Sequence, residues 1–215
     1  MDIVKNFELV KKTITNNIKI IAVSKTKSKD KILKIYNIGH RNFGENKIQE
    51  LKEKYNELPN DIKWHMIGHV QRNKVKYIAP FIELIHSVDS LKLLKEIDKQ
   101  AKKNKRTIKC LLQIKIANEE NKFGLFKDEV ENLILFSNNL NNVKIIGLMG
   151  MATFTDNHKI IDREFKEISS LFKILKVSYK QLSILSIGMS NDYLIAINNG
   201  SNMVRIGSQI FGERN

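Results

Sequence analysis

The feature that most constrains the fold is a regular alternation along all 215 residues. Short apolar, β-branched runs alternate with longer segments of helical period, which predicts strands that are each followed by a helix. The expected strands cover about 18–24, 41–46, 61–68, 81–88, 107–116, 143–150, 182–188 and 203–207. The helical segments that follow them cover about 29–39, 47–57, 71–80, 89–105, 127–138, 157–177, 191–198 and 208–211.

Buried strands separated by crossover helices predict a parallel sheet, and eight such units predict a closed (β/α)8 barrel of the TIM type. Residues 1–16 read as an extra N-terminal helix before the first strand. We expect one α/β domain over 1–215, because only Pro59 and Pro80 occur and no low-complexity linker divides the chain. The alternative is an open doubly wound sheet. A dinucleotide-binding version of it is disfavoured because no G-x-G-x-x-G follows the first strand.

The chain carries 37 Lys and Arg against 23 Asp and Glu, a net charge of +14. A basic chain allows a binding module for RNA or membrane surfaces as one class of function. The charge is spread along the whole length, however, and no nucleic-acid motif accompanies the densest cluster at 102–106. We therefore do not expect nucleic acid to be the main partner.

One cysteine, Cys110, excludes an internal disulfide and fits a reducing compartment. It lies within an apolar run, which predicts a buried small side chain rather than a nucleophile. No apolar run is long enough for a transmembrane helix, and the N-terminus mixes charges into its apolar pattern, unlike a signal peptide. We expect a cytoplasmic protein, and a barrel with a charged exterior permits a monomer.

In a barrel of this type the functional site lies at the carboxyl ends of the strands, often with a phosphate site after strands seven and eight. The stretch "GMSND" places Ser190 after the seventh strand, and "RIGSQIFG" places Gly207 and Ser208 after the eighth. Both loops open a helical segment whose N–H groups can bind an anion. The alternative is that Ser190 and Ser208 only cap these helices.

The first strand, in "IIAVSKTKS", runs directly into Lys25. A lysine held near a phosphate site can form a Schiff base with an aldehyde. Lysine, phosphate site and barrel together suggest pyridoxal 5′-phosphate (PLP), with Arg205 facing the pyridine nitrogen. Arginine only donates, so it would leave that nitrogen unprotonated and weaken the ring as an electron sink. Lys27 and Lys29 need no such role and are expected to be solvated.

His65 and His69, in "WHMIGH", are four residues apart, which suits zinc ligands on a helix. Here they fall on a strand that ends at Gly68, so they would not share a face. We do not expect a metal site.

Several motifs occur in order over nearly the whole chain: "AVSKTK" at 22–27, "NFGEN" at 42–46, "WHMIGHVQRNK" at 64–74, "HSVDS" at 86–90, "GLMGMA" at 147–152, "LSIGMSND" at 185–192 and "VRIGSQIFGER" at 204–214. Together they resemble the pyridoxal phosphate homeostasis proteins, which are similar to the barrel domain of alanine racemase. The resemblance implies a fold type III barrel with PLP on Lys25. Two positions depart from the family pattern: Ser28 replaces a common proline, and His69 replaces a frequently apolar residue.

The resemblance also implies a role for each cofactor-binding residue. The phosphate contacts fall on Ser190, Gly207 and Ser208, Arg205 faces the pyridine nitrogen, and Asn46 lies near the 3-hydroxyl group of the cofactor. Alanine racemases add a C-terminal β domain that supplies a tyrosine acid/base, whereas this sequence ends at about the end of the barrel. The family is regarded as non-enzymatic.

The resemblance thus implies a PLP carrier for vitamin B6 and amino-acid homeostasis, with PLP-dependent apo-enzymes as candidate partners and no catalytic residues. The alternative is a small PLP-dependent racemase or lyase that takes its acid/base groups from barrel loops or from a partner subunit. Exchange of the α-hydrogen of an amino acid in deuterated water separates the two.

Overall fold

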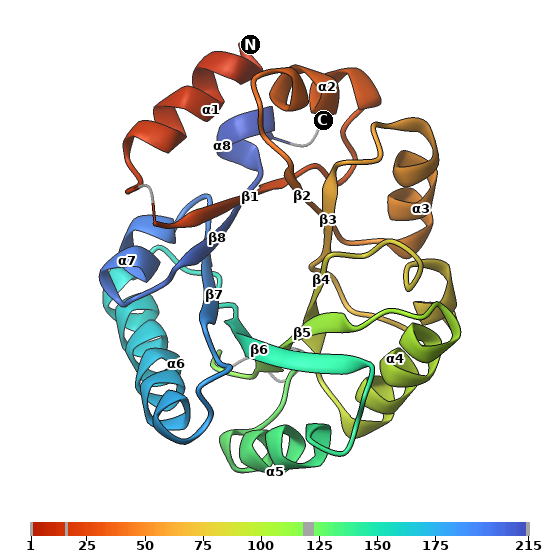
Figure 1. Cartoon of the computed structure of the whole chain (residues 1–215). Helices are drawn as coiled ribbons and strands as arrows, with labels where there is room; N and C mark the ends of the chain where they lie inside the picture. Colours follow the sequence, from red (N-terminus) through yellow and green to blue (C-terminus); the bar gives the residue numbers. More distant parts are fainter. Residues whose placement is uncertain (1, 16, 118–122, 214–215) are drawn as a thin grey trace.

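The computed structural model describes residues 2–15, 17–117 and 123–213. Eight parallel strands pair in chain order, and β1 pairs with β8 to close the barrel (Figure 1). This confirms the predicted (β/α)8 architecture and rules out the open sheet. The strands are β1 (Lys19–Val23), β2 (Asn42–Glu45), β3 (Lys63–Met66), β4 (Leu84–Val88), β5 (Ile108–Ile114), β6 (Val143–Gly150), β7 (Ile184–Met189) and β8 (Met203–Ile206).

The helices surround the barrel (Figure 1). They are α1 (Ile3–Lys12), α2 (Lys29–Asn37), α3 (Ile48–Glu57), η1 (Arg72–Tyr77), α4 (Leu91–Lys103), α5 (Lys127–Ser137), α6 (His158–Ser178), α7 (Tyr193–Asn198) and α8 (Ser208–Phe211). The segment expected as a helix over 71–80 is a 3₁₀ helix and is shorter than predicted. Such helices serve as short connectors, and this one buries only Val75 before the chain reaches Pro80.

Alternation along the strands separates two apolar regions. Ile21 belongs to a small cluster inside the barrel, whereas its neighbour Ala22 belongs to the large core between the barrel and the helices. Successive strand residues point to opposite faces. Continuing past β1, Lys25 follows the side of Ile21, toward the barrel mouth, and Ser24 follows the side of Ala22, toward the helices.

The closing seam joins the two ends of the sequence. Ile21 lies opposite Arg205 in the β1–β8 pairing. α1 and α8 lie side by side outside this seam (Figure 1), where the Asn6 amide donates to the carbonyl of Ile210. Barrel closure therefore brings the segment after β1 next to the segment after β8, as expected for a site shared by Lys25 and Arg205.

Cys110 is buried in β5, which confirms its predicted environment, and burial raises the pKa of its thiol. Across the described ranges, no helix has both the length and the apolar character needed to span a bilayer.

Candidate functional site

A cavity of about 610 Å³ lies at the carboxyl ends of the strands. Its lining includes residues that follow β1, β2, β3, β6, β7 and β8. All six residues predicted to bind a cofactor are among them: Lys25, Asn46, Ser190, Arg205, Gly207 and Ser208. The structure thus brings together groups that are up to 183 positions apart in the sequence, from 25 to 208.

Lys25 is half-buried in the second position of a tight turn. The N–H of Lys27 donates to the carbonyl of Ser24 at 3.0 Å and closes this turn. Thr26, in the third position, has a φ of 63°, a left-handed conformation that usually falls to glycine there. For a β-branched residue this conformation is an outlier and costs about 1–3 kcal/mol.

The loops after β7 and β8 are joined by a hydrogen bond. The N–H of Gly207 donates to Ser190 Oγ at 3.2 Å, and the Gln209 amide donates to the Ser190 carbonyl at 2.7 Å. The N-cap of α7 is Asp192 and that of α8 is Gly207. The reading of Ser190 and Ser208 as helix caps is therefore wrong.

Gly207 lies close to the first strand. A Cβ atom at Gly207 would come within 3.3 Å of the Val23 Cβ, which is closer than most side-chain contacts allow. A glycine here lets the loop after β8 approach the end of β1. The lining residues that follow β8 therefore lie next to those that follow β1.

Arg205 is 3% exposed and begins a polar column inside the barrel. Its guanidinium donates to Ser186 Oγ at 2.8 Å, to the Ser186 carbonyl at 2.6 Å and to the Gly150 carbonyl at 2.9 Å. In the described part of the chain, no carboxylate lies within ion-pair distance of it. Burial lowers the pKa of Arg205 to about 10, so the group stays charged at neutral pH.

Two histidines extend the column. Ser186 Oγ lies 3.2 Å from His86 Nδ1, His86 Nε2 lies 2.9 Å from His65 Nδ1, and His65 Nε2 lies 3.3 Å from Asn42 Oδ1. Because the amide oxygen of Asn42 only accepts, each group in turn donates toward Asn42 and accepts from the Arg205 side. A single set of proton positions satisfies the whole column with both histidines neutral.

The histidines are neutral because they are buried. Burial lowers the pKa of His65 to about 3 and lowers that of His86 well below its ordinary value. His86 lies in the middle of β4 and points into the interior. Its role is therefore tied to Arg205 through Ser186.

One expectation is revised, and one departure from the family pattern is located. Lys27 was expected to be solvated, but its amine donates to the carbonyls of Gly212 and Glu213, each at 3.0 Å. His69 does not line the cavity at the carboxyl ends of the strands; it pairs with Asp89 at 3.0 Å, stacks on Phe123 and lines a separate surface pocket.

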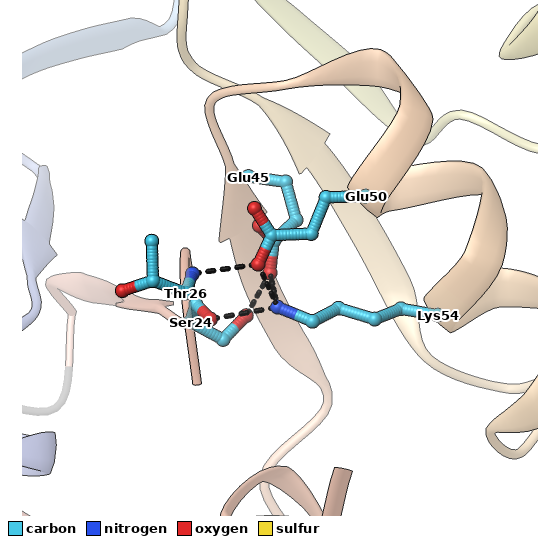
Figure 2. A network of polar contacts seen from close by, with 5 residues as sticks. All are labelled: Ser24, Thr26, Glu45, Glu50 and Lys54. Carbon is cyan, nitrogen blue, oxygen red and sulfur yellow. Dashed lines mark hydrogen bonds and ion pairs between the residues drawn. The ribbon is translucent and has the colours of Figure 1, made fainter. Parts of the chain in front are cut away.

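Sequence reasoning missed the polar residues behind Lys25, which Figure 2 shows around the Ser24 backbone. Glu45 and Lys54 are buried, at 0% and 6% exposure, and Glu50 is partly buried. The spacing of Glu50 and Lys54 on one helix predicts an i,i+4 pair. Nothing in the sequence predicts that this pair is turned inward against the barrel.

The profile of the family "Alanine racemase, N-terminal domain" matches residues 2–215. A pyridoxal phosphate homeostasis protein from Aquifex aeolicus is 38% identical over 201 residues, which covers 93% of this chain and 88% of the relative. Matches at this level extend over nearly the whole barrel.

The comparison with solved structures agrees with these sequence matches. PipY of Synechococcus elongatus, without PLP, superposes with a TM-score of 0.93 at 31% identity, covering 98% of this chain and 100% of PipY. Its PLP-bound form gives a TM-score of 0.90 at 30% identity, with the same coverage. An alanine racemase from Clostridium difficile is 16% identical, with a TM-score of 0.80, and shows the fold alone; the match covers 99% of this chain and 56% of the racemase.

Proposed function

Because this chain belongs to the pyridoxal phosphate homeostasis proteins, within the family of the alanine racemase N-terminal domain, we propose that it binds PLP in the cavity at the barrel mouth. The cofactor is held there as a Schiff base on Lys25. The protein acts in PLP and amino-acid homeostasis as a single-domain, monomeric carrier in the cytoplasm.

The observation that carries this proposal is the convergence of Lys25, Arg205 and the linked Ser190 and Gly207 loops on one cavity. Arg205 is a buried cation held by neutral oxygens, and no described carboxylate pairs with it. An electron-rich ring nitrogen therefore fits beside it better than a protonated one. The residues present fit PLP on chemical grounds.

Each residue would do a separate task. Ser190 and Ser208, with the Gly207 backbone, would hold the phosphate, and Asn46 would bind the 3-hydroxyl group. PLP supplies an aldehyde and a ring that withdraws electrons from groups bonded to it. Arg205 would keep the ring nitrogen without a proton, which weakens that withdrawal and suits storage better than turnover.

The lining of the cavity holds few groups suited to acid/base chemistry. Among the described lining residues there is no histidine, the side chain that most often moves protons near neutral pH, and no tyrosine or cysteine. The lining includes the carboxylic acids Asp156, Asp192 and Glu213, and Asp192 already accepts a hydrogen bond from the N–H of Met189. PLP-dependent apo-enzymes are the proposed recipients of the cofactor.

The test is reconstitution of the purified chain with PLP, followed by borohydride reduction and peptide mapping. We expect an absorption band displaced from that of free PLP, and an adduct on the peptide that contains Lys25. Lys25→Ala should lose both, whereas Lys29→Ala, an exposed lysine four positions away, should keep both. A reduced adduct on another lysine, or none at all, would refute the proposal.

The carrier role has its own measurement. The reconstituted protein should cause no steady exchange of the α-hydrogen of alanine or serine in deuterated water. It should transfer PLP to an apo-enzyme, measured as regained activity of that enzyme. Robust α-exchange would instead establish the alternative, a small racemase or lyase.

A further inference from the structure

The backbone on both sides of Lys25 is bonded by a charged cluster in which Glu45 and Lys54 are buried and Glu50 is partly buried. We call Glu45, Glu50 and Lys54 the clamp; Figure 2 shows its contacts with Ser24 and Thr26. Glu45 ends β2, and the other two residues lie on α3, so the clamp stands between the barrel and a helix.

The clamp bonds the turn at three atoms. Lys54 Nζ donates to the Ser24 carbonyl at 2.8 Å, and Ser24 Oγ donates to Glu45 Oε1 at 2.6 Å. On the other side of Lys25, the N–H of Thr26 donates to Glu50 Oε1 at 2.6 Å. The residue before Lys25 and the residue after it are therefore both held.

The clamp is also held together internally. Lys54 Nζ lies 2.8 Å from Glu45 Oε1 and 2.7 Å from Glu50 Oε1. One ammonium group thus joins both carboxylates to the carbonyl of the turn. Buried ion pairs often contribute little net stability compared with apolar residues of similar size. What distinguishes this cluster is where its bonds go: to the strained turn that carries Lys25.

Glu45 has one further feature. Among the described residues, its buried Oε2 atom has no hydrogen-bond partner. The hydrogen bonds of this carboxylate are made by Oε1 alone, to Ser24 and Lys54.

We propose that Glu45, Glu50 and Lys54 are positioning residues that hold the Ser24–Lys27 turn, with Thr26 in its left-handed conformation, and so aim Lys25 into the cofactor cavity. This rests on the proposed function. The step that they serve is condensation: the Lys25 nitrogen bonds to the aldehyde carbon, and the carbonyl oxygen leaves with two hydrogens as one water, giving C=N. The clamp takes no part in these bond changes.

The variant pair that isolates the clamp is Glu50→Ala and Glu50→Gln. Alanine removes the acceptor of the Thr26 N–H, whereas glutamine keeps a carbonyl oxygen there. Glu53→Ala is the matched control, because it removes the same group from an exposed position on the same helix. Each full-length variant is titrated with PLP and with pyridoxine 5′-phosphate, which has the same phosphate and ring but an alcohol in place of the aldehyde.

We expect Glu50→Ala to weaken PLP binding about tenfold, equivalent to about 1.4 kcal/mol, and pyridoxine 5′-phosphate binding by less than about twofold. Glu50→Gln should retain most PLP affinity, and Glu53→Ala should match the unaltered chain. Adding Thr26→Gly to Glu50→Ala should restore PLP binding at least in part, because glycine adopts a positive φ without strain.

The outcomes are distinct. Equal weakening of both ligands by Glu50→Ala, or no change in either, would overturn the clamp while leaving the proposed function intact. Failure of Thr26→Gly to restore any binding would also overturn it, because the turn would then not be what the clamp controls. If the unaltered chain binds no PLP, the proposed function fails and the clamp proposal fails with it.

Discussion

Two polar networks end at two basic residues of the cavity, Lys25 and Arg205, and they are built differently. The clamp contains three full charges and bonds the backbone on both sides of Lys25. The column consists of neutral groups, Ser186, His86 and His65, that follow one another away from Arg205. Its first member, Ser186, accepts a hydrogen bond from the arginine side chain. In the proposed function, Lys25, whose amine reacts with the cofactor, is positioned through its backbone. Arg205, whose charge faces the cofactor, is held by its side chain.

The two networks also differ in the free energy of unfolding that is lost when one member is removed. Removing one charge from the clamp leaves opposite charges buried without a partner, whereas removing one neutral member of the column leaves unsatisfied dipoles. The two networks should also respond in opposite directions to acid, since their titrating groups are of opposite type.

The largest effect is expected for Lys54→Met, which leaves the buried Glu45 without its cation. We expect a loss of about 3–5 kcal/mol in the free energy of unfolding, measured by urea denaturation of the cofactor-free protein. The double variant Lys54→Met/Glu45→Gln should recover part of this loss, because no unpaired charge then remains at Glu45. A loss under about 1 kcal/mol in Lys54→Met would show that water solvates the cluster.

Acid should destabilise the protein through the column. His65 and His86 have pKa values that are lower in the folded protein than the ordinary 6.5, so the unfolded chain binds their protons first. The contribution of these histidines to the free energy of unfolding should be fully present above about pH 6.5. It should fall as the pH decreases below that value, by up to about 1.4 kcal/mol per pH unit for each histidine. Denaturation midpoints at a series of pH values measure this.

The clamp contributes with the opposite sign. Burial raises the pKa of Glu45, so the folded state holds that proton more tightly, and this contribution to stability is greater at low pH and is lost as the pH rises. Replacing His65 and His86 together by Gln should reduce the acid slope to the part that comes from His40, whose pKa burial lowers to about 4, whereas Glu45→Gln should steepen the slope. The same slope in the unaltered chain, the double histidine variant and Glu45→Gln would show that these residues do not determine the pH dependence of stability.

A smaller effect is expected for His86→Leu, which interrupts the column between Ser186 and His65. The loss should be about 1–3 kcal/mol, because two neutral partners lose a hydrogen bond in a buried site. PLP affinity should fall as well, since Arg205 then loses the support of an ordered Ser186. His69→Leu, outside the column, serves as the control and should leave PLP affinity unchanged.

The smallest effect is expected for an ion pair on the surface. Lys29 and Glu57 join α2 to the end of α3 with both side chains about half exposed, at 48% and 50%. Lys29→Ala should change the free energy of unfolding by about 0–1 kcal/mol. A loss as large as that of Lys54→Met would contradict the prediction that the buried ion pairs of the clamp affect stability more than an exposed ion pair does.

Much of the barrel could be predicted because its strands are apolar, short and regularly spaced. β6, over Val143–Gly150, and α8, over Ser208–Phe211, have the predicted bounds, and the other strands differ from prediction only at their ends. The main departure is η1, where a basic segment with one buried side chain forms a 3₁₀ helix. Local pattern specifies which segments are strands, and eight strand–helix units favour a closed barrel over an open sheet.

The amino-acid sequence by itself determined the fold, the family and the lysine that follows the first strand, because these depend on local periodicity and on ordered motifs. Only the tertiary structure decided how that lysine is held. Lys54 lies on α3, Glu45 ends β2 and Ser24 follows β1. A charged helix residue such as Lys54 has the sequence pattern of a solvated one, and only the folded barrel buries it. Burial and contact between distant segments are properties of the closed barrel. They bring polar residues that are far apart in the sequence into two networks, one charged and one built of neutral groups.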